Sequence, residues 1–546
     1  MTKVIVIGID GCEPTLVERW KDSLPNLKKI IEGGIHGTLK STIPPTSSPA
    51  WISLYTGKNP AKYGIFGFVN VSRDLTTNIV DSTLCDSLSI YEILSKFGKR
   101  VCVLNVPVTY PPRNVNGYMV AGYPAPLSKD DYTFPRHLYK ELDKIVGNYQ
   151  TDVIYSSPED AGEEMFLSEM SEVHHKVKTI AKYLHGKEDW DFFMVVFREI
   201  DYVQHFFWKY MNQNDHTKIH QKYENVTKEW YVRIDNTVGE ILDELDDDTY
   251  VIIVSDHGCQ AVKYTIHINE WLMKHEWLNF LNEKKGIPVS FFMALRKLVV
   301  KYANPYLIKK LISIIPHWLL TKATLSRRID QGINYFFTRI NWSRTKIYAL
   351  SGTNAALYVN LKRENVLGIV TPGKEYDVLI SKVIESLKGI SQEVNKLIIV
   401  RIYKKEDIYW GRYSHMAPDL TVDFFIEDTK CFVDSETGHG KILDEIEAYV
   451  NGIHSNEGIW IATGPGVQKD MKINANIVDI APTILYLLDI PIPDDMDGKV
   501  ILQGLTLTKT PRYQESKTGK IKEISPYSSQ DEKEIMKRLK ALGYIS

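Results

Sequence analysis

Short, continuous apolar runs recur along the first half of the chain, and segments with helical periodicity lie between them. Four runs have this character: residues 3–9, 100–105, 191–197 and 249–255. Runs of this length without polar alternation are typical of strands buried on both faces of a parallel sheet. Their alternation with helices predicts a doubly wound α/β fold.

The remaining elements follow from the same periodicities. Helices are expected over residues 88–97, 158–186 and about 217–246, and later over 477–488 and 531–542. Strand-like sequence returns in four further short runs: 346–350, 356–360, 419–423 and 458–462.

Residues 276–340 differ in character from the rest of the chain. No acidic residue lies between Glu283 and Asp330, basic residues alternate with apolar ones, and three prolines divide the segment into short helices. We expect an inserted helical cap. It is either a packed subdomain with a solvated basic face, or a basic lid over an anionic substrate. A third alternative is peripheral membrane contact, through residues 284–329 and acidic lipid headgroups.

These patterns predict a division of the chain into four parts. Two core segments, 1–275 and 341–510, flank the insertion at 276–340. A tail over 511–546 ends in a charged helix with a glycine stop, which we expect to dock on the surface.

The composition of the 546-residue chain is that of an ordinary globular protein, with 44% hydrophobic and 25% charged residues. A net charge of -2 argues against a nucleic-acid polymer as partner. Five cysteines without paired spacing argue against a disulfide framework and a zinc-thiolate site. Neither a membrane span nor a cleavable signal pattern is present, so we expect a cytoplasmic enzyme. The sequence does not indicate an oligomeric state.

A proline-bracketed loop presents three adjacent hydroxyls, those of Thr46, Ser47 and Ser48, before an apolar helical segment. Proline rigidifies such a loop, and a helix start offers free N–H groups and a positive dipole end. The loop suits a nucleophile that attacks an anionic ester. Helix capping by Ser or Thr is the alternative.

Carboxylates and imidazoles follow the predicted strands at their carboxyl ends, where α/β sheets place ligands. Asp201 and His205 are four apart and share one face of a helix, and Asp256 and His257 are adjacent. With the hydroxyl near residue 47, the possible metal ligands are Asp10, Ser47, Asp201, His205, Asp256, His257 and His454. Seven such ligands suffice for two divalent cations. The donor types favour zinc, with manganese as the next choice.

Several motifs resemble the type I phosphodiesterase/nucleotide pyrophosphatase family of the alkaline phosphatase superfamily. They are Ile-Gly-Ile-Asp10-Gly, Pro-Pro-Thr-Ser47-Ser-Pro-Ala-Trp, Asp201-Tyr-Val-Gln-His205, Ser-Asp256-His257-Gly, Ala-Pro418-Asp419-Leu, Gly-Ile-His454, Asp479-Ile-Ala-Pro-Thr and Asp497-Gly. The resemblance covers most of the chain outside the insertion and tail. It implies an alkaline phosphatase-like three-layer α/β/α core with a largely parallel sheet.

The resemblance also implies roles for the seven residues. Asp10, Ser47, Asp256 and His257 would surround one metal, and Asp201, His205 and His454 the other. Ser47 would be the nucleophile of a phosphodiesterase or nucleotide pyrophosphatase that forms a phosphoseryl intermediate on a small-molecule phosphoester. Monoester hydrolysis, phosphomutase action and lipid-headgroup transfer use the same machinery. A catalytically silent binding protein of this fold is a further alternative.

Two positions depart from the family pattern, and one ligand position has a rival. Phe68 stands where nucleotide pyrophosphatases have an Asn that holds a phosphoryl oxygen, and Tyr63 stands where His is usual. His439, in Gly438-His-Gly440, rivals His454 as the third ligand. The physiological substrate therefore stays open.

Overall fold

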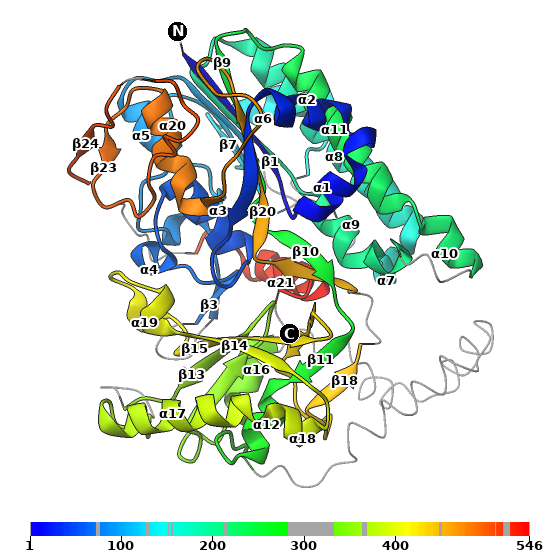
Figure 1. Cartoon of the computed structure of the whole chain (residues 1–546), viewed down its shortest axis with the longest axis vertical. Coiled ribbons are helices and arrows are strands. Elements are labelled where there is room, and N and C mark those ends of the chain that lie inside the picture. Colours follow the sequence, from blue (N-terminus) through cyan, green and yellow to red (C-terminus); the bar gives the residue numbers. More distant parts are fainter. Residues whose placement is uncertain are drawn as a thin grey trace.

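A ten-stranded mixed sheet forms the centre of the larger of two lobes (Figure 1). In this computed structural model the strand order is β21-β2-β20-β9-β1-β8-β5-β6-β7, and β22 also pairs with β2. The five central strands from β9 to β6 are parallel, whereas β20 and β7 run antiparallel to their inner neighbours. The strands of this sheet are β1 Lys3–Ile9, β2 Ile35–Lys40, β5 Val101–Val106, β6 Gly117–Ala121, β7 Thr133–Phe134, β8 Phe192–Phe197, β9 Thr249–Val254, β20 Glu457–Thr463, β21 Met471–Lys472 and β22 Ala475–Asn476.

The structure describes eleven ranges of the chain: 2–71, 77–126, 131–150, 152–153, 157–211, 217–281, 332–362, 368–446, 450–507, 509–516 and 525–544. Most of the predicted helical cap, including 284–329, lies outside them. Among the helices within these ranges, none is both long and apolar enough to cross a membrane.

Helices cover both faces of the sheet, which makes the lobe a three-layer α/β/α sandwich (Figure 1). One face carries α2, α8, α9 and α11, and the other carries α3, α5 and α20. The helices of this lobe are α1 Pro14–Trp20, α2 Pro25–Gly33, α3 Ser47–Thr56, α4 Pro60–Tyr63, α5 Ile90–Lys96, α6 Leu138–Val146, α7 Pro158–Ala161, α8 Glu163–Lys187, α9 Glu199–Phe207, α10 Lys218–Tyr223, α11 Val226–Leu242 and α20 Ile480–Leu487. The predicted α/β core with a largely parallel sheet is confirmed.

The four apolar runs form the centre of this sheet as β1, β5, β8 and β9, and their side chains are almost entirely buried. The long predicted helices are each interrupted. Gly162, with φ of +85°, separates α7 from α8, because the left-handed conformation ends a helix at little cost for glycine. A break at residues 224–225 separates α10 from α11.

A smaller lobe has a hydrophobic core of its own. That core contains residues from 266–278 and from 337–433, whereas the core of the first lobe resumes near residue 450. The sequence predicts that residues 341–510 belong to the main core as one block, but apolar contacts place only their later part there. The difference arises because strand periodicity shows that a strand is buried, not which sheet buries it.

The smaller lobe is built on two sheets, ordered β12-β13-β15-β14 with β16 on β15, and β17-β11-β18. Its elements are β11 Tyr264–His267, α12 Ile268–Lys274, α16 Gly332–Arg339, β12 Ile347–Leu350, β13 Ala355–Val359, α17 Lys374–Lys388, α18 Ile390–Val394, β14 Ile399–Lys404, α19 Lys405–Ile408, β15 Leu420–Ile426, β16 Thr429–Lys430, β17 Phe432–Asp434 and β18 Leu443–Glu445. Small two-stranded pairs complete the fold: β3 Val69–Val71 with β4 Thr77–Ile79, β10 Gly258–Ala261 with β19 Gly452–Ser455, and β23 Ile492–Pro493 with β24 Tyr513–Gln514.

The C-terminal helix α21 (Ser529–Ala541) lies between the two lobes rather than on an open surface (Figure 1). Ile535 and Leu539 on its inner face are fully buried, and Arg538 is only 2% exposed. These residues pack into the core of the larger lobe, while Lys533 and Lys537 on the outer face of the helix are exposed. The chain end is thereby brought beside the carboxyl ends of the central strands.

Candidate active site

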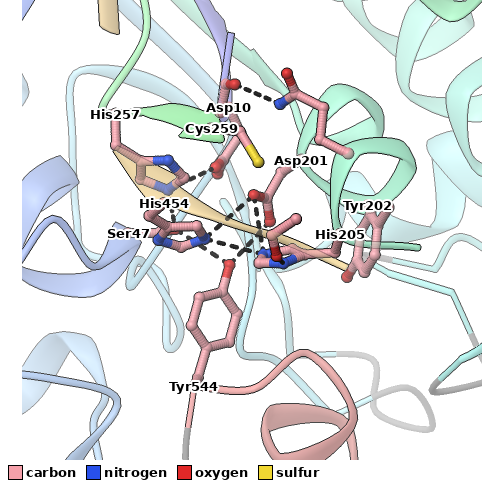
Figure 2. A network of polar contacts seen from close by, with 12 residues as sticks. Asp10, Ser47, Asp201, Tyr202, His205, His257, Cys259, His454 and Tyr544 are labelled. Carbon is pink, nitrogen blue, oxygen red and sulfur yellow. Dashed lines mark hydrogen bonds and ion pairs between the residues drawn. The ribbon is translucent and has the colours of Figure 1, made fainter. Parts of the chain in front are cut away.

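All seven residues predicted to bind metal gather at the edge of the sheet where β1, β8 and β9 end, and Figure 2 labels all of them except Asp256. Each is at most 2% exposed. Buried carboxylates and imidazoles in this number are costly unless they are paired or bind a cation. The arrangement therefore requires a functional explanation.

The turn after β1 places Asp10 in the site. Gly11 adopts φ of +70°, and a Cβ atom on it would lie 3.0 Å from a carboxylate oxygen of Asp201. Glycine is needed here for both reasons. The Nε1 group of Trp51 donates to Asp10 Oδ2 at 3.1 Å, and Arg198 Nε lies 3.7 Å from the same oxygen. These contacts fix the carboxylate and leave Asp10 Oδ1 facing the site.

Ser47 is the first residue of α3, and its hydroxyl is completely buried. Thr46 occupies the N-cap position but makes no side-chain capping bond. The hydroxyl of Ser48 has no hydrogen-bond partner within the described residues. Helix capping therefore does not account for these three hydroxyls. The Ser47 side chain is directed at the imidazole of His257, with 3.1 Å between Oγ and Nε2.

The first group of ligands surrounds the Nε2 atom of His257. It lies 3.2 Å from Asp256 Oδ2 and 3.6 Å from Asp10 Oδ1. The Nδ1 atom of the same ring lies 3.0 Å from the carbonyl oxygen of Gly258, to which it can only donate. In the neutral ring, Nε2 then carries a lone pair that faces two carboxylate oxygens and the Ser47 hydroxyl. A bound cation turns these repulsive contacts into ligand contacts.

The second group consists of Asp201 and His205 on α9 and His454 on β19 (Figure 2). Asp201 Oδ1 lies 3.2 Å from His205 Nε2 and 3.3 Å from His454 Nε2, and the two nitrogens are 2.9 Å apart. Ligands held about 2.0–2.2 Å from a tetrahedral ion are separated by about 3.3–3.6 Å. The three atoms have nearly the spacing of one face of such a site.

The charges of these groups are strongly perturbed. Burial raises the pKa of Asp256 to about 7, and the Asp201 carboxylate adds to the rise. Burial likewise raises the pKa of Asp10, with repulsion from Asp256 and Asp201. Burial and the neighbouring His257 ring lower the pKa of His454 to about 3, so this ring is neutral. Neutral imidazoles and mutually repelling carboxylates are the state that divalent cations stabilise.

Three carboxylate oxygens in the described site have no hydrogen-bond donor: Asp10 Oδ1, Asp201 Oδ1 and Asp256 Oδ2. All three face the imidazole Nε2 atoms. The donor set of oxygen and imidazole nitrogen suits zinc or manganese. The residues therefore fit the expected cations, with Asp10, Asp256, His257 and Ser47 around one position and Asp201, His205 and His454 around the other.

His439 does not join this site. It belongs to a separate group in the smaller lobe, where its Nε2 atom lies 3.3 Å from Asp434 and its ring stacks on His267. His454 is instead in contact with both His205 and His257. The geometry thus separates the two histidines that the sequence left as rivals.

The two substitutions in the family pattern have different consequences. Tyr63 is a buried support for α3, since its hydroxyl donates to the Pro49 carbonyl at 2.8 Å and contacts Ser53. Phe68 is buried next to the site and packs against Tyr544, with 4.7 Å between ring centroids. Its ring offers no donor to a substrate.

Tyr544, whose hydroxyl reaches Asp201 and Ser47, is not predicted from the sequence (Figure 2). The same holds for Trp51 and Arg198, which support Asp10. Trp51 and Arg198 lie in apolar segments that read as core. The apolar spacing of Ile535, Leu539 and Leu542 was the one signal that the helix before Tyr544 is buried.

A cleft of about 90 Å³ is lined by residues of both lobes, among them Thr46, the neighbour of Ser47 in the chain. Phe66 and Phe68 of the larger lobe line it with Tyr358 and Tyr409, and Tyr544 forms its inner end. Phe66 and Tyr409 pack edge to face. The cleft offers aromatic surface to a group attached to a phosphoryl centre at Ser47.

A buried hydroxyl between two groups of carboxylates and imidazoles is the kind of site found in metal-dependent hydrolases of phosphoric esters. The family model for type I phosphodiesterase/nucleotide pyrophosphatase matches residues 4–439, and the chain belongs to this family. The resemblance seen in the motifs is confirmed, and the protein is a hydrolase of phosphodiesterase/pyrophosphatase type. His454 lies beyond the matched range, so its place in the site rests on the structure.

Solved structures that resemble this chain include human ectonucleotide pyrophosphatase/phosphodiesterase 5. The TM-score is 0.49, with 14% identity over 92% of this chain and 98% of that chain. An inactive variant of the murine protein in complex with AMP gives a TM-score of 0.48 and 14% identity over 90% of this chain and 96% of that chain. A search of curated proteins finds no significant match.

Proposed function

We propose that this hydrolase cleaves phosphodiesters or nucleotide pyrophosphates through a phosphoseryl intermediate on Ser47, with two divalent cations bound by the six surrounding carboxylates and imidazoles. The observation that carries the proposal is the position of the Ser47 hydroxyl. It is buried at the start of α3, 3.1 Å from Nε2 of His257 in the first ligand group. It also contacts Tyr544, whose hydroxyl donates to Asp201 of the second group.

The residues of the chain have distinct roles in this reaction. Ser47 Oγ forms the bond to phosphorus, while the bond from phosphorus to the leaving oxygen breaks and that oxygen keeps the electron pair. The Ser47 proton is released and a proton is taken up by the leaving oxygen. Water then attacks phosphorus, the bond from phosphorus to Oγ breaks, and one proton of the water returns to Ser47. Two divalent cations, zinc first and manganese next, lower the pKa of the nucleophilic hydroxyl and neutralise the phosphoryl charge when bound. No separate general base is then required.

The aromatic cleft favours a diester or pyrophosphate over a monoester. A diester carries a second substituent that needs a place next to the phosphoryl group, and Phe66, Tyr358 and Tyr409 provide an apolar one. The buried cation closest to Asp10, Arg198, is engaged by the Asp10 and Asp152 carboxylates. Its Nε and Nη2 groups make no hydrogen bond within the described residues, so Arg198 by itself does not discriminate between a monoester and a diester.

The proposal is tested on the full-length protein loaded with zinc or manganese. We expect about two metal ions per chain by mass spectrometry and faster turnover of bis-p-nitrophenyl phosphate than of p-nitrophenyl phosphate. Ser47→Ala should reduce the rate by about 10³-fold or more, because the attacking atom is lost. Ser48→Ala is the matched control and should retain activity. A preference for the monoester, or an active Ser47→Ala variant, would contradict the proposal.

A screen of nucleotides, dinucleotides, sugar nucleotides and phospholipid headgroup esters, each with zinc and with manganese, then identifies the substrate class. Phospholipid esters test the headgroup-transfer alternative, since transfer to an added alcohol would appear as a second product. Hydrolysis of a dinucleotide to two mononucleotides is the result we expect.

A further inference from the structure

Tyr544, the last residue that the structure describes, lies inside the site. It is 497 positions from the proposed nucleophile, Ser47. The hydroxyl of Tyr544 donates to Asp201 Oδ2 at 2.9 Å and lies 3.3 Å from Ser47 Oγ. Its ring packs against Phe68. It also packs against the imidazoles of His205 and His454 (Figure 2). The side chain is 6% exposed, so this is a buried position of the fold.

The backbone after α21 fixes this position. The N–H of Tyr544 donates to the Leu539 carbonyl and that of Gly543 to the Lys540 carbonyl, each at 3.0 Å. These two bonds define a Schellman motif, which needs the left-handed conformation that Gly543 adopts, with φ of +74°. The tyrosine therefore leaves the helix in one defined direction.

The helix itself is anchored in the larger lobe. Arg538 is buried and donates to Asp152 at 3.3 Å and to the Ala125 carbonyl at 3.2 Å. Tyr527, just before the helix, donates to the Pro124 carbonyl at 2.9 Å. A buried ion pair and a helix-stop motif thus hold Tyr544 in one position.

The hydroxyl of Tyr544 has one proton and two neighbouring oxygens that can accept it. In the free site the proton points to Asp201, and the Ser47 hydroxyl can donate to His257 Nε2 or to the phenol oxygen. Rotation about the bond from the ring to the oxygen turns the same proton toward Ser47. A phosphoryl group joined to Ser47 Oγ has its other oxygens within one hydrogen bond of this position.

We infer that Tyr544 is a catalytic residue whose hydroxyl donates a hydrogen bond to an oxygen of the phosphoryl group during its transfer to Ser47. The inference rests on the proposed function, because it takes Ser47 as the nucleophile. Negative charge grows on the phosphoryl oxygens and on Ser47 Oγ as the proton leaves, and a fixed donor in a buried site is effective against such charge.

Tyr544→Phe keeps the ring and removes the donor. In the metal-loaded full-length enzyme we expect kcat for bis-p-nitrophenyl phosphate to fall by about 10- to 100-fold, with a smaller change in KM. Tyr486→Phe is the matched control, since it removes a similarly buried hydroxyl that donates to the Lys509 carbonyl in another part of the lobe. It should leave kcat unchanged.

Anion binding provides a readout that does not depend on turnover. In the Ser47→Ala background we expect Tyr544→Phe to weaken binding of inorganic phosphate by about tenfold in calorimetry, because a hydrogen bond to a charged group is lost. Both variants are compared at saturating metal, because Tyr544 also orients the Asp201 carboxylate and its loss should weaken metal affinity. A chain that ends at Gly543 should show the same losses, and it separates loss of the tyrosine from a poorly folded Tyr544→Phe variant.

Two results would overturn the inference. One is an unchanged kcat and phosphate affinity in Tyr544→Phe. The other is faster turnover by the chain that ends at Gly543, which would identify the tail as an occluding segment. Either failure is distinct from failure of the proposed function, which would appear as a wild-type protein without phosphodiesterase activity or as an active Ser47→Ala variant.

Discussion

The Nε2 atoms of His205 and His454 lie 2.9 Å apart, while the Nδ1 atoms of both rings face main-chain carbonyl oxygens at 2.9 and 2.8 Å. A carbonyl only accepts, so each Nδ1 carries the proton and each neutral ring presents a lone pair to the other. A positive charge must lie between them. In metal-free protein a proton on His205 can serve, because burial lowers its pKa but the Asp201 carboxylate outweighs burial and raises it.

His454 and His439 should differ in their effect on the metal content of the protein. His454→Gln should reduce metal content from about two ions per chain to about one, because it removes a ligand in contact with His205 and Asp201. His439→Gln is the control, since His439 pairs with Asp434 in the smaller lobe. It should leave the metal content of the candidate site and the turnover unchanged. Equal metal loss in both variants would contradict the assignment.

Metal-free Asp256 should make stability depend on pH in a defined direction. Its pKa is about 7 in the fold against an ordinary 3.8, so the folded state binds more protons in this window. The stability that its carboxyl contributes is fully present below about pH 4 and is lost as the pH rises through 7. Asn at this position cannot ionise.

In chelator, the melting temperature of Asp256→Asn should therefore rise relative to wild type between pH 4 and pH 8. In the zinc-loaded proteins the order should reverse at pH 8, because the variant lacks a ligand. A difference that does not change with pH in chelator would show that Asp256 is not protonated in the metal-free fold.

Trp51 should affect metal affinity without contacting the metal. Its Nε1 group donates to Asp10 Oδ2 and orients the carboxylate. Trp51→Phe should weaken zinc binding by about 10- to 100-fold, the usual effect of losing a group that orients a ligand. Trp460→Phe is matched, since Trp460 is also buried and donates to the Ile473 carbonyl. The control should lose stability but bind zinc normally in a competition assay.

The aromatic cleft should select for bulky substituents. Phe66 is half-buried and packs on Tyr409 at its edge. Phe66→Ala should raise KM for bis-p-nitrophenyl phosphate by about tenfold and should change KM for methyl p-nitrophenyl phosphate little, because the smaller diester fills less of the cleft. Phe425→Ala, on a half-buried position of β15, is the control. An equal change in KM for the two diesters would show that the second substituent of the diester does not bind in this cleft.

Local sequence predicted most of the larger lobe and most of the candidate site. Apolar runs followed by Asp10 or by Asp256 and His257 mark the ends of buried strands, and parallel strands bring those ends to one edge. The spacing of Asp201 and His205 needs only a helix to place both on one face. These relationships are local or follow from sheet topology, so they are visible without a structure.

The remaining features depend on contacts that no local pattern encodes. Nothing near Tyr544 indicates that its hydroxyl meets Asp201, which is 343 positions away. Likewise, the periodicity of residues 346–360 shows strands but not that they belong to a second core. His439 lies between two glycines and His454 lies in a segment bracketed by Gly452 and Gly458, so the choice between them required the family motif and then the geometry.

The most direct test of the account is to find the phosphoryl group on Ser47. Metal-loaded enzyme that is turning over a diester is quenched in acid, digested and mapped by tandem mass spectrometry. We predict a phosphoryl adduct on Ser47 alone. It should be absent from Ser47→Ala and present in Ser48→Ala. An adduct on Thr46 or Ser48, or complete turnover with no adduct on this peptide under any quench time, would contradict it.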